Sequence, residues 1–274
     1  MKIQLIAMDL DGTALQSDRC SFSLRLIRAL DEAHKRGIAI VPVTGRQFGM
    51  LPPAVQNHPA WENLVVLCNG SQIRRLSTGQ ILYEKNISRT ALEPLLALSR
   101  ELDIPIEFSV NSALHLTERS YMQQQGIEGL FFHLNTILAN HGKVVSSLEP
   151  LCSMAVEKCN LPYIPPEKHR EAEQLLKGIP VSAVWSSATS MEITHPDATK
   201  GSALEALCEL LDIPLKNTLA LGDSGNDESM LTAAGIGIAM GNAPEHIKQM
   251  ADGITERCEK DGAAIAIERY ALNP

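Results

Sequence analysis

Short apolar runs alternate with amphipathic segments along this chain, and this alternation restricts its fold more than any other feature. An apolar run over 2–8 stops abruptly at Asp9, a helical pattern covers 23–36, and further apolar runs cover 38–43 and 64–68. Short runs that are apolar throughout are typical of parallel strands buried on both faces. Strands and helices in alternation predict an α/β fold with a doubly wound, mainly parallel sheet.

The same alternation returns near the C-terminus, after a long segment of different texture. The later elements are predicted as strands over 191–194, 219–221 and 236–240, and helices over 202–211, 228–234 and 263–272. The intervening segment is rich in proline, and its strand patterns alternate between apolar and polar residues. Thr90 and Glu93 have the spacing of a capping box for a helix that ends near Leu102. We therefore expect a discontinuous core domain, residues 1–85 and 191–274, with a mostly antiparallel α+β domain inserted at 86–190.

Composition excludes several classes of protein and partner. The chain of 274 residues is 45% apolar and 20% charged, which excludes disordered and fibrous proteins. We expect no membrane partner, because no apolar run approaches the ~18 residues of a membrane span, and no secretory signal. A net charge of −8 argues against nucleic acid as a partner. The six cysteines are scattered, with no C-x-x-C pair, which favours reduced thiols in a cytoplasmic protein.

Polar side chains gather where the predicted strands end. Asp9-Leu-Asp-Gly-Thr follows the first strand, Thr44-Gly45-Arg46 follows the second, and Gly222-Asp-Ser-Gly-Asn-Asp227 follows a late one. Lys200 begins the helix that precedes this late strand. Because ligands of open α/β sheets bind beyond the carboxyl ends of the strands, we expect these groups to meet at one edge.

The residue types at this edge indicate a phosphate site that contains a metal ion. Neighbouring carboxylates repel one another unless a cation is present, and carboxylate oxygens suit Mg²⁺. Glycine amides can approach an anion closely, and a lysine at a helix N-terminus is unfavourable unless an anion accompanies it. Each motif alone could be an ordinary turn or a solvated lysine. Their joint placement at strand ends favours a site.

Other ligand motifs are incomplete. The sequence has no G-x-x-x-x-G-K-[ST] loop, so a P-loop nucleotide site is excluded. Gly235-Ile-Gly237 begins like a dinucleotide fingerprint, but Met240 occupies the position of the third glycine. Neither aspartate cluster has the sixth-position glycine of a calcium loop.

The four motifs, in this order, resemble those of the haloacid dehalogenase-like (HAD) phosphatases. The segment from Gly222 to Leu231, together with 239–243 and 261–263, resembles the Cof-type subgroup of sugar and metabolite phosphatases. That subgroup carries its cap as one insertion between the second and third motifs. The resemblance therefore implies a HAD-like Rossmannoid core with an α+β cap at 86–190 that governs substrate selection.

The resemblance also implies a role for each motif residue. Asp9 would be the nucleophile and form an aspartyl-phosphate, and Asp11 would act as general acid and then general base. The groups that would bind the substrate phosphate are the Leu10 amide, Thr44, Gly45, Lys200 and Asn226. The groups that would hold Mg²⁺ are Asp9, the carbonyl of Asp11, and Asp223. Asp227 and Arg46 would support the site.

The expected function is that of a Mg²⁺-dependent phosphatase of small phosphorylated metabolites, with sugar phosphates as the leading class. A sugar phosphomutase on the same core is an alternative, since it uses the same aspartyl-phosphate. A non-enzymatic phosphate-sensing module is less compatible with Asp11, because a phospho-acceptor needs no second acid. Hydrolysis of C–halogen bonds is disfavoured, because it needs no metal cluster. The only expected partner is a small phosphate ester; the sequence specifies neither which metabolite nor the oligomeric state.

Overall fold

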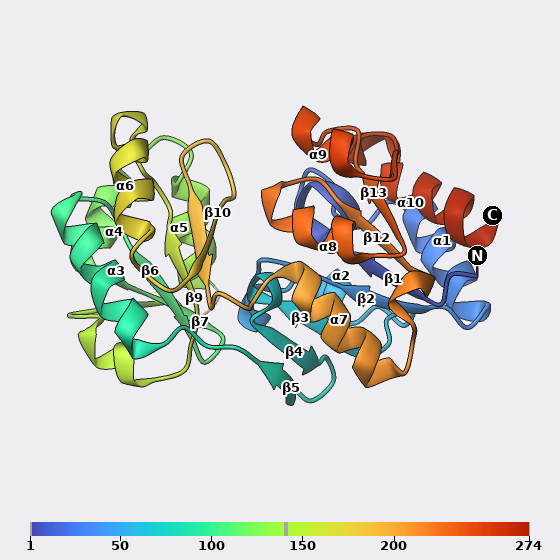
Figure 1. The fold of residues 1–274 in the computed structure, drawn as a ribbon, viewed down its shortest axis with the longest axis horizontal. Coiled ribbons are helices and arrows are strands. Elements are labelled where there is room, and N and C mark those ends of the chain that lie inside the picture. Colours follow the sequence, from blue (N-terminus) through green and yellow to red (C-terminus); the bar gives the residue numbers. More distant parts are fainter. Residues whose placement is uncertain (1, 140–141, 274) are drawn as a thin grey trace. The chain divides into compact units, whose positions relative to one another are not determined.

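The computed structural model describes residues 2–139 and 142–273, which form two compact units. Unit 1 comprises Met1–Gly45, Leu51–Tyr83 and Thr199–Pro274, and unit 2 comprises Arg46–Met50 and Glu84–Ala198. Figure 1 shows both units coloured along the sequence. Within the described residues, no helix has the length and apolar character needed to cross a membrane.

Unit 1 is built on a five-stranded parallel sheet with the order β14-β13-β12-β1-β2. Its strands are β1 (Leu5–Met8), β2 (Ala39–Pro42), β12 (Thr218–Gly222), β13 (Ile236–Ala239) and β14 (Gly253–Ile254). A second sheet has the order β3-β4-β5, formed by β3 (Leu64–Leu67), β4 (Gln72–Arg75) and β5 (Ile81–Glu84). A parallel bridge between Val43 and Val66 joins the two sheets. Because the large sheet is parallel, the carboxyl ends of β1, β2 and β12 lie at one edge.

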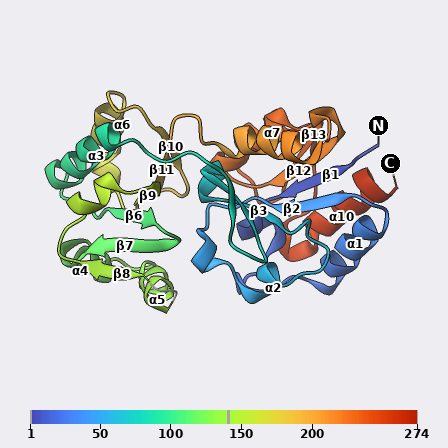
Figure 2. The same cartoon turned by 90° about the horizontal axis from the view of Figure 1, so that it is seen from below.

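Helices cover both faces of the parallel sheet. The helices of unit 1 are α1 (Leu24–Lys35), α2 (Pro53–Gln56), α7 (Lys200–Leu211), α8 (Glu228–Ala233), α9 (Glu245–Met250) and α10 (Gly262–Ile267). In Figure 2, α7 lies on one side of the sheet, and α1 and α10 lie on the other. Leu5 and Ala7 of β1 are buried in one core with Leu204 and Leu207 of α7. This arrangement confirms the doubly wound fold predicted from the sequence.

Unit 2 contains a six-stranded sheet with the order β10-β11-β9-β6-β7-β8, antiparallel except for the β7–β8 pair. Its strands are β6 (Glu107–Val110), β7 (Ala113–Thr117), β8 (Lys143–Val145), β9 (Val156–Leu161), β10 (Ser182–Trp185) and β11 (Met191–Thr194). Its helices are α3 (Arg89–Glu101), α4 (Glu118–Gln125), α5 (Phe131–Ala139) and α6 (His169–Leu176). Phe108 of β6 is buried with residues of α3 and α6, and Leu116 of β7 with Leu134 of α5. The unit thus has its own apolar core.

The capping box predicted for α3 is wrong. The N-cap is Ser88, and its side chain makes no capping hydrogen bond. Glu93 pairs instead with Arg89, one helical turn earlier on an exposed face. Such an exposed pair contributes little, so α3 owes its stability to the buried leucines of its other face.

Candidate active site

A buried lysine connects two of the predicted aspartates. Lys200 is the first residue of α7, and its side chain has no exposed surface. Its Nζ donates to Oδ1 of Asp9 and to Oδ1 of Asp227, both at 2.6 Å. The N-cap Thr199 fixes this helix end through a reciprocal capping box with Ser202. A fully buried ammonium group requires charged partners, and these two carboxylates supply them.

Asp227 also orders the loop that follows β12. Its Oδ2 accepts the backbone N–H groups of Asp223 at 2.9 Å and Ser224 at 3.0 Å. Its side chain is fully buried. One carboxylate therefore binds Lys200 with one oxygen and shapes the loop with the other. Asp227 thereby fixes the positions of both Lys200 and Asp223.

Asp223 is held from two sides by residues that the sequence analysis did not assign to the site. Thr13 Oγ1 donates to Oδ1 of Asp223 at 3.4 Å, and Asn242 Nδ2 donates to Oδ2 at 3.1 Å. Asn242 Nδ2 also lies 2.9 Å from the Gly12 carbonyl oxygen, and its Oδ1 accepts the backbone N–H of Cys258 at 2.9 Å. Two sequence signals could have found Asn242: it stands shortly after a predicted strand, and it lies within 239–243, the segment that resembles the Cof-type subgroup.

Gly12 leaves the space that Asp223 fills. Its φ of +79° is a left-handed conformation that glycine adopts without strain. A Cβ atom at this position would lie only 2.3 Å from Oδ2 of Asp223. A glycine in the Asp9-Leu-Asp-Gly-Thr motif is therefore required both by the backbone and by the close approach of the carboxylate.

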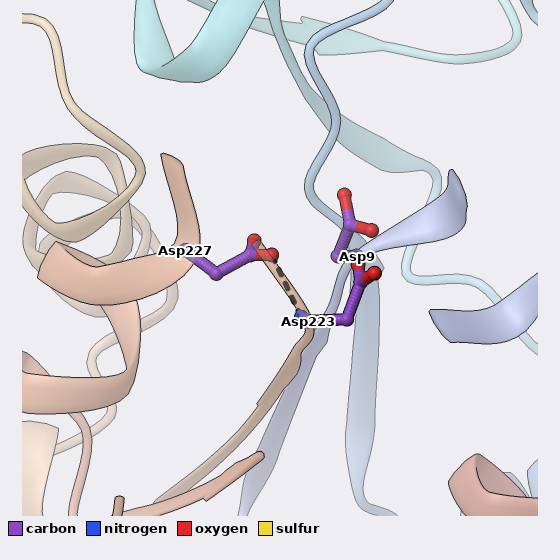
Figure 3. Close-up of side chains that lie close together, drawn as sticks. All are labelled: Asp9, Asp223 and Asp227. Atoms are coloured by element: carbon purple, nitrogen blue, oxygen red, sulfur yellow. Dashed lines mark hydrogen bonds between the residues drawn. The ribbon is translucent and has the colours of Figure 1, made fainter. Parts of the chain in front are cut away.

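The carboxylates of Asp9, Asp223 and Asp227 form a cluster that fits a divalent cation. Each offers one oxygen, and these oxygens lie within 4.8 Å of one another. Figure 3 shows Asp9 beside Asp223, with the side chain of Asp227 extended toward the backbone of Asp223. Oxygen donors of this kind are the ligands that Mg²⁺ prefers. Lys200 contacts two of these three carboxylates directly, so negative charge exceeds positive charge among these four side chains.

The pKa values in the cluster are shifted in the directions that an excess of negative charge produces. Burial, together with the charges of Asp227 and Asp223, raises the pKa of Asp9 well above its usual value, although Lys200 opposes the shift. Burial and Asp227 raise the pKa of Asp223 to about 7. Burial alone would lower the pKa of Lys200, but Asp227 and Asp9 outweigh it and raise that pKa. A bound divalent cation would favour the ionised form of these carboxylates.

The remaining residues predicted for the site lie on neighbouring segments, with one exception. Leu10 and Asp11 directly follow Asp9, and Thr44, which is buried, donates its N–H to the Val66 carbonyl at 2.9 Å. Gly45 ends the first segment of unit 1. Arg46 belongs to unit 2, where its guanidinium donates to the Met50 carbonyl at 3.2 Å. A supporting role of Arg46 stays a prediction.

Asn226 contacts Asn69, which directly follows the apolar run over 64–68 and was not predicted for the site. Its Nδ2 donates to Oδ1 of Asn69 at 3.1 Å, and its Oδ1 accepts from Ser224 Oγ at 2.7 Å. Asn69 lies directly beyond β3 and is buried. Its place after a strand is the same signal that identified Asp9 and Thr44, so the rule used for those residues could have found it.

Known proteins match this chain along nearly its whole length. The sequence model of the haloacid dehalogenase-like hydrolase family matches residues 6–267. Phosphatase YwpJ of Bacillus subtilis is 30% identical over 96% of this chain and 98% of its own. A 5-amino-6-(5-phospho-D-ribitylamino)uracil phosphatase of the same organism, YcsE, is 26% identical over 98% of this chain and 96% of its own. A solved haloacid dehalogenase-like hydrolase from B. subtilis superimposes with a TM-score of 0.83 at 27% identity, covering 98% of this chain and all of its own.

Proposed function

This chain belongs to the haloacid dehalogenase-like hydrolases and is a Cof-type phosphatase. On that premise we propose that it hydrolyses small phosphate monoesters in a Mg²⁺-dependent reaction, with Asp9 as the nucleophile. Sugar phosphates are the substrate class that we propose first. The observation that carries the proposal is the buried Lys200, which contacts both the proposed nucleophile and Asp227.

The proposed reaction has two steps on Asp9. A carboxylate oxygen of Asp9 attacks phosphorus, and the bond from phosphorus to the ester oxygen breaks. Asp11 gives its proton to the departing alkoxide. Asp11, now ionised, takes a proton from a water molecule whose oxygen attacks the same phosphorus. The bond between phosphorus and Asp9 then breaks, which releases phosphate and restores both side chains.

Fixed groups around Asp9 would stabilise the charge of the transferring phosphoryl group. Lys200 needs no reorganisation, because its ammonium is already held by two carboxylates. The Leu10 and Gly45 amides, the Thr44 hydroxyl and the Asn226 amide are the proposed hydrogen-bond donors. Since the protein carries a net charge of −8, attraction of an anionic substrate must be this local.

The proposed magnesium site consists of Asp9, the Asp11 carbonyl and Asp223, with Asp227 in support. When bound, Mg²⁺ would supply positive charge that offsets the repulsion between carboxylates and phosphate. Thr13 and Asn242 hold Asp223 in place for this purpose through their hydrogen bonds to its two oxygens.

We also propose that the inserted segment 86–190 is the cap that selects the substrate. Its support is that unit 2 has an apolar core of its own, so this segment can vary in sequence without disturbing the parallel sheet. The resemblance on which the cap assignment depends lies in the flanking motifs.

Phosphate release from a panel of sugar phosphates, nucleotides and cofactor phosphates tests the proposal. The wild type is assayed with Mg²⁺ and with EDTA, beside Asp9→Asn and Asp11→Asn. Asp212→Asn is the matched control, because Asp212 is exposed and asparagine tolerates its left-handed conformation. We expect release that requires both the metal and Asp9. Full release by Asp9→Asn would refute the mechanism, and isomerised product without free phosphate would point to a phosphomutase.

A further inference from the structure

The turn that follows β3 has an unusual backbone conformation. Three consecutive residues have positive φ angles: Cys68 at 51°, Asn69 at 57° and Gly70 at 102°. Residues other than glycine are uncommon in this region, although asparagine adopts it more readily than most. Such a conformation persists only where the surrounding structure holds it, and it is enriched at functional sites. The contacts of this turn therefore require an explanation.

The turn contacts three separate segments of the proposed phosphate site. The backbone N–H of Asn69 donates to the Thr44 carbonyl at 3.1 Å, and its side-chain Oδ1 accepts from Asn226 at 3.1 Å. Gly70 packs against the N-cap of the helix that begins with Lys200, since an added Cβ would lie 2.1 Å from the Thr199 carbonyl oxygen. One turn thus links the loops after β2 and β12 with the start of α7.

The side-chain amide of Asn226 is held at both ends. Its Oδ1 accepts from Ser224 Oγ, and one N–H of its Nδ2 donates to Asn69. Within residues 2–139 and 142–273, the second N–H of this nitrogen has no protein partner. An asparagine amide has a broad range of χ2 angles unless contacts restrict it. With both ends held, the direction of the remaining N–H is determined.

We propose that Asn69 is a positioning residue: it holds the Asn226 amide so that the remaining N–H is presented to a phosphoryl oxygen of the substrate. The inference rests on the proposed function, because that function places phosphate beside Asn226. Asn69 itself needs no contact with the substrate. It is buried, and its Oδ1 accepts the hydrogen bond from Asn226.

The variant Asn69→Gly tests this role without disturbing the turn. Glycine adopts a positive φ readily, and the hydrogen bond from the residue 69 N–H to Thr44 remains possible. We expect kcat/KM for the best substrate to fall about tenfold, the effect of one lost hydrogen bond, and the Ki of inorganic phosphate to rise by a similar factor. The unfolding midpoint should change little. Asn111→Gly is the control, because Asn111 has a φ of 50° and an exposed side chain.

A double-mutant cycle with Asn226→Ala separates positioning from general damage. If Asn69 acts through Asn226, then Asn69→Gly has no further effect on kcat/KM or on Ki in the Asn226→Ala background. An equal fall in both backgrounds would overturn the proposal, as would an unchanged Ki in the single variant.

The Asp9→Asn comparison shows separately whether the proposed function holds. If the wild type hydrolyses no compound of the panel, binding of inorganic phosphate is measured by calorimetry instead. The proteins compared are the wild type, Asn69→Gly, Asn226→Ala and the double variant. Equal affinities of wild type and Asn69→Gly would then refute the role of Asn69.

Discussion

Replacement of Lys200 by methionine tests the electrostatic account of the site most directly. The Nζ atom lies 2.6 Å from one oxygen of Asp9 and one of Asp227, and all three side chains are buried. At an effective dielectric constant of about 20, each such contact is worth roughly 6 kcal/mol before desolvation is counted. Since desolvation offsets much of this attraction, removal of one partner from a buried ion pair costs about 3–5 kcal/mol. For a domain of this size the unfolding midpoint should fall by roughly 6–20 °C.

The two tryptophans allow unit 1 to be followed alone. Trp61 is buried in unit 1 and Trp185 lies in unit 2. In a Trp185→Phe background, the fluorescence of Trp61 reports the unfolding of unit 1 on heating. Lys177→Met is the matched control, because Lys177 is exposed and lies in unit 2. We expect its Trp61 transition to coincide with that of the background protein.

The loss of stability caused by Lys200→Met should increase as the pH rises. Burial raises the pKa of Asp9, and Lys200 opposes this shift, so its removal raises the pKa further. A carboxyl whose pKa is higher in the folded than in the unfolded state stabilises the fold below its unfolded pKa, and this contribution is lost as pH rises through the folded pKa. The deficit should therefore be largest near pH 8 and smaller near pH 5.5. A Trp61 midpoint within about 2 °C of the background at pH 8 in EDTA would refute the reasoning.

Two further predictions concern Gly12 and the ion pair in unit 2 between the half-buried His133 and the buried Glu107. Gly12→Ala should lower kcat/KM by about 100-fold, because its Cβ displaces Asp223. Gly37→Ala is the control, because Gly37 has a φ of +73° and an added Cβ would meet no atom within 4 Å; it should lose only about 1–2 kcal/mol of stability in urea unfolding. Equal kcat/KM values for the two variants would show that the Cβ at position 12 does not displace Asp223. Burial alone would lower the pKa of His133, but Glu107 outweighs it and raises that pKa, whereas the pKa of Glu107 is lowered despite burial. The stabilisation from His133 is therefore complete below pH 6.5 and is lost as pH rises through the raised pKa. His133→Gln should lower the free energy of unfolding of unit 2 by roughly 1.5 kcal/mol at pH 6 and by clearly less at pH 9, with unfolding monitored by Trp185 fluorescence. A difference between variant and wild type that does not change with pH would exclude this ion pair as its source.

Local pattern was sufficient to predict the fold and the neighbourhood of the site. The apolar runs that become β1, β2 and β12 are recognisable by their length and continuity, and polar residues stand where each run ends. Parallel pairing then places these ends at one edge of the sheet, so the proximity of Asp9 to the loop with Asp223 and Asp227 follows from topology. The roles assigned to these residues stay predictions until the assays above are made.

Local pattern was insufficient for contacts between side chains far apart in the sequence. Asn69 and Asn242 are short polar residues after strands, and such residues are common in ordinary turns. What distinguishes them is a partner: Asn226 for Asn69, and Asp223 together with the Gly12 carbonyl for Asn242.

The sequence also could not predict that the two oxygens of Asp227 have different partners. One of its oxygens binds Lys200 and the other orders the loop after β12. Sequence by itself determined the strands, the helices and the edge at which the motifs meet, because hydrophobic periodicity is a local property. Only the tertiary structure decided which groups contact one another there, because hydrogen bonds and ion pairs depend on atomic distances that packing sets.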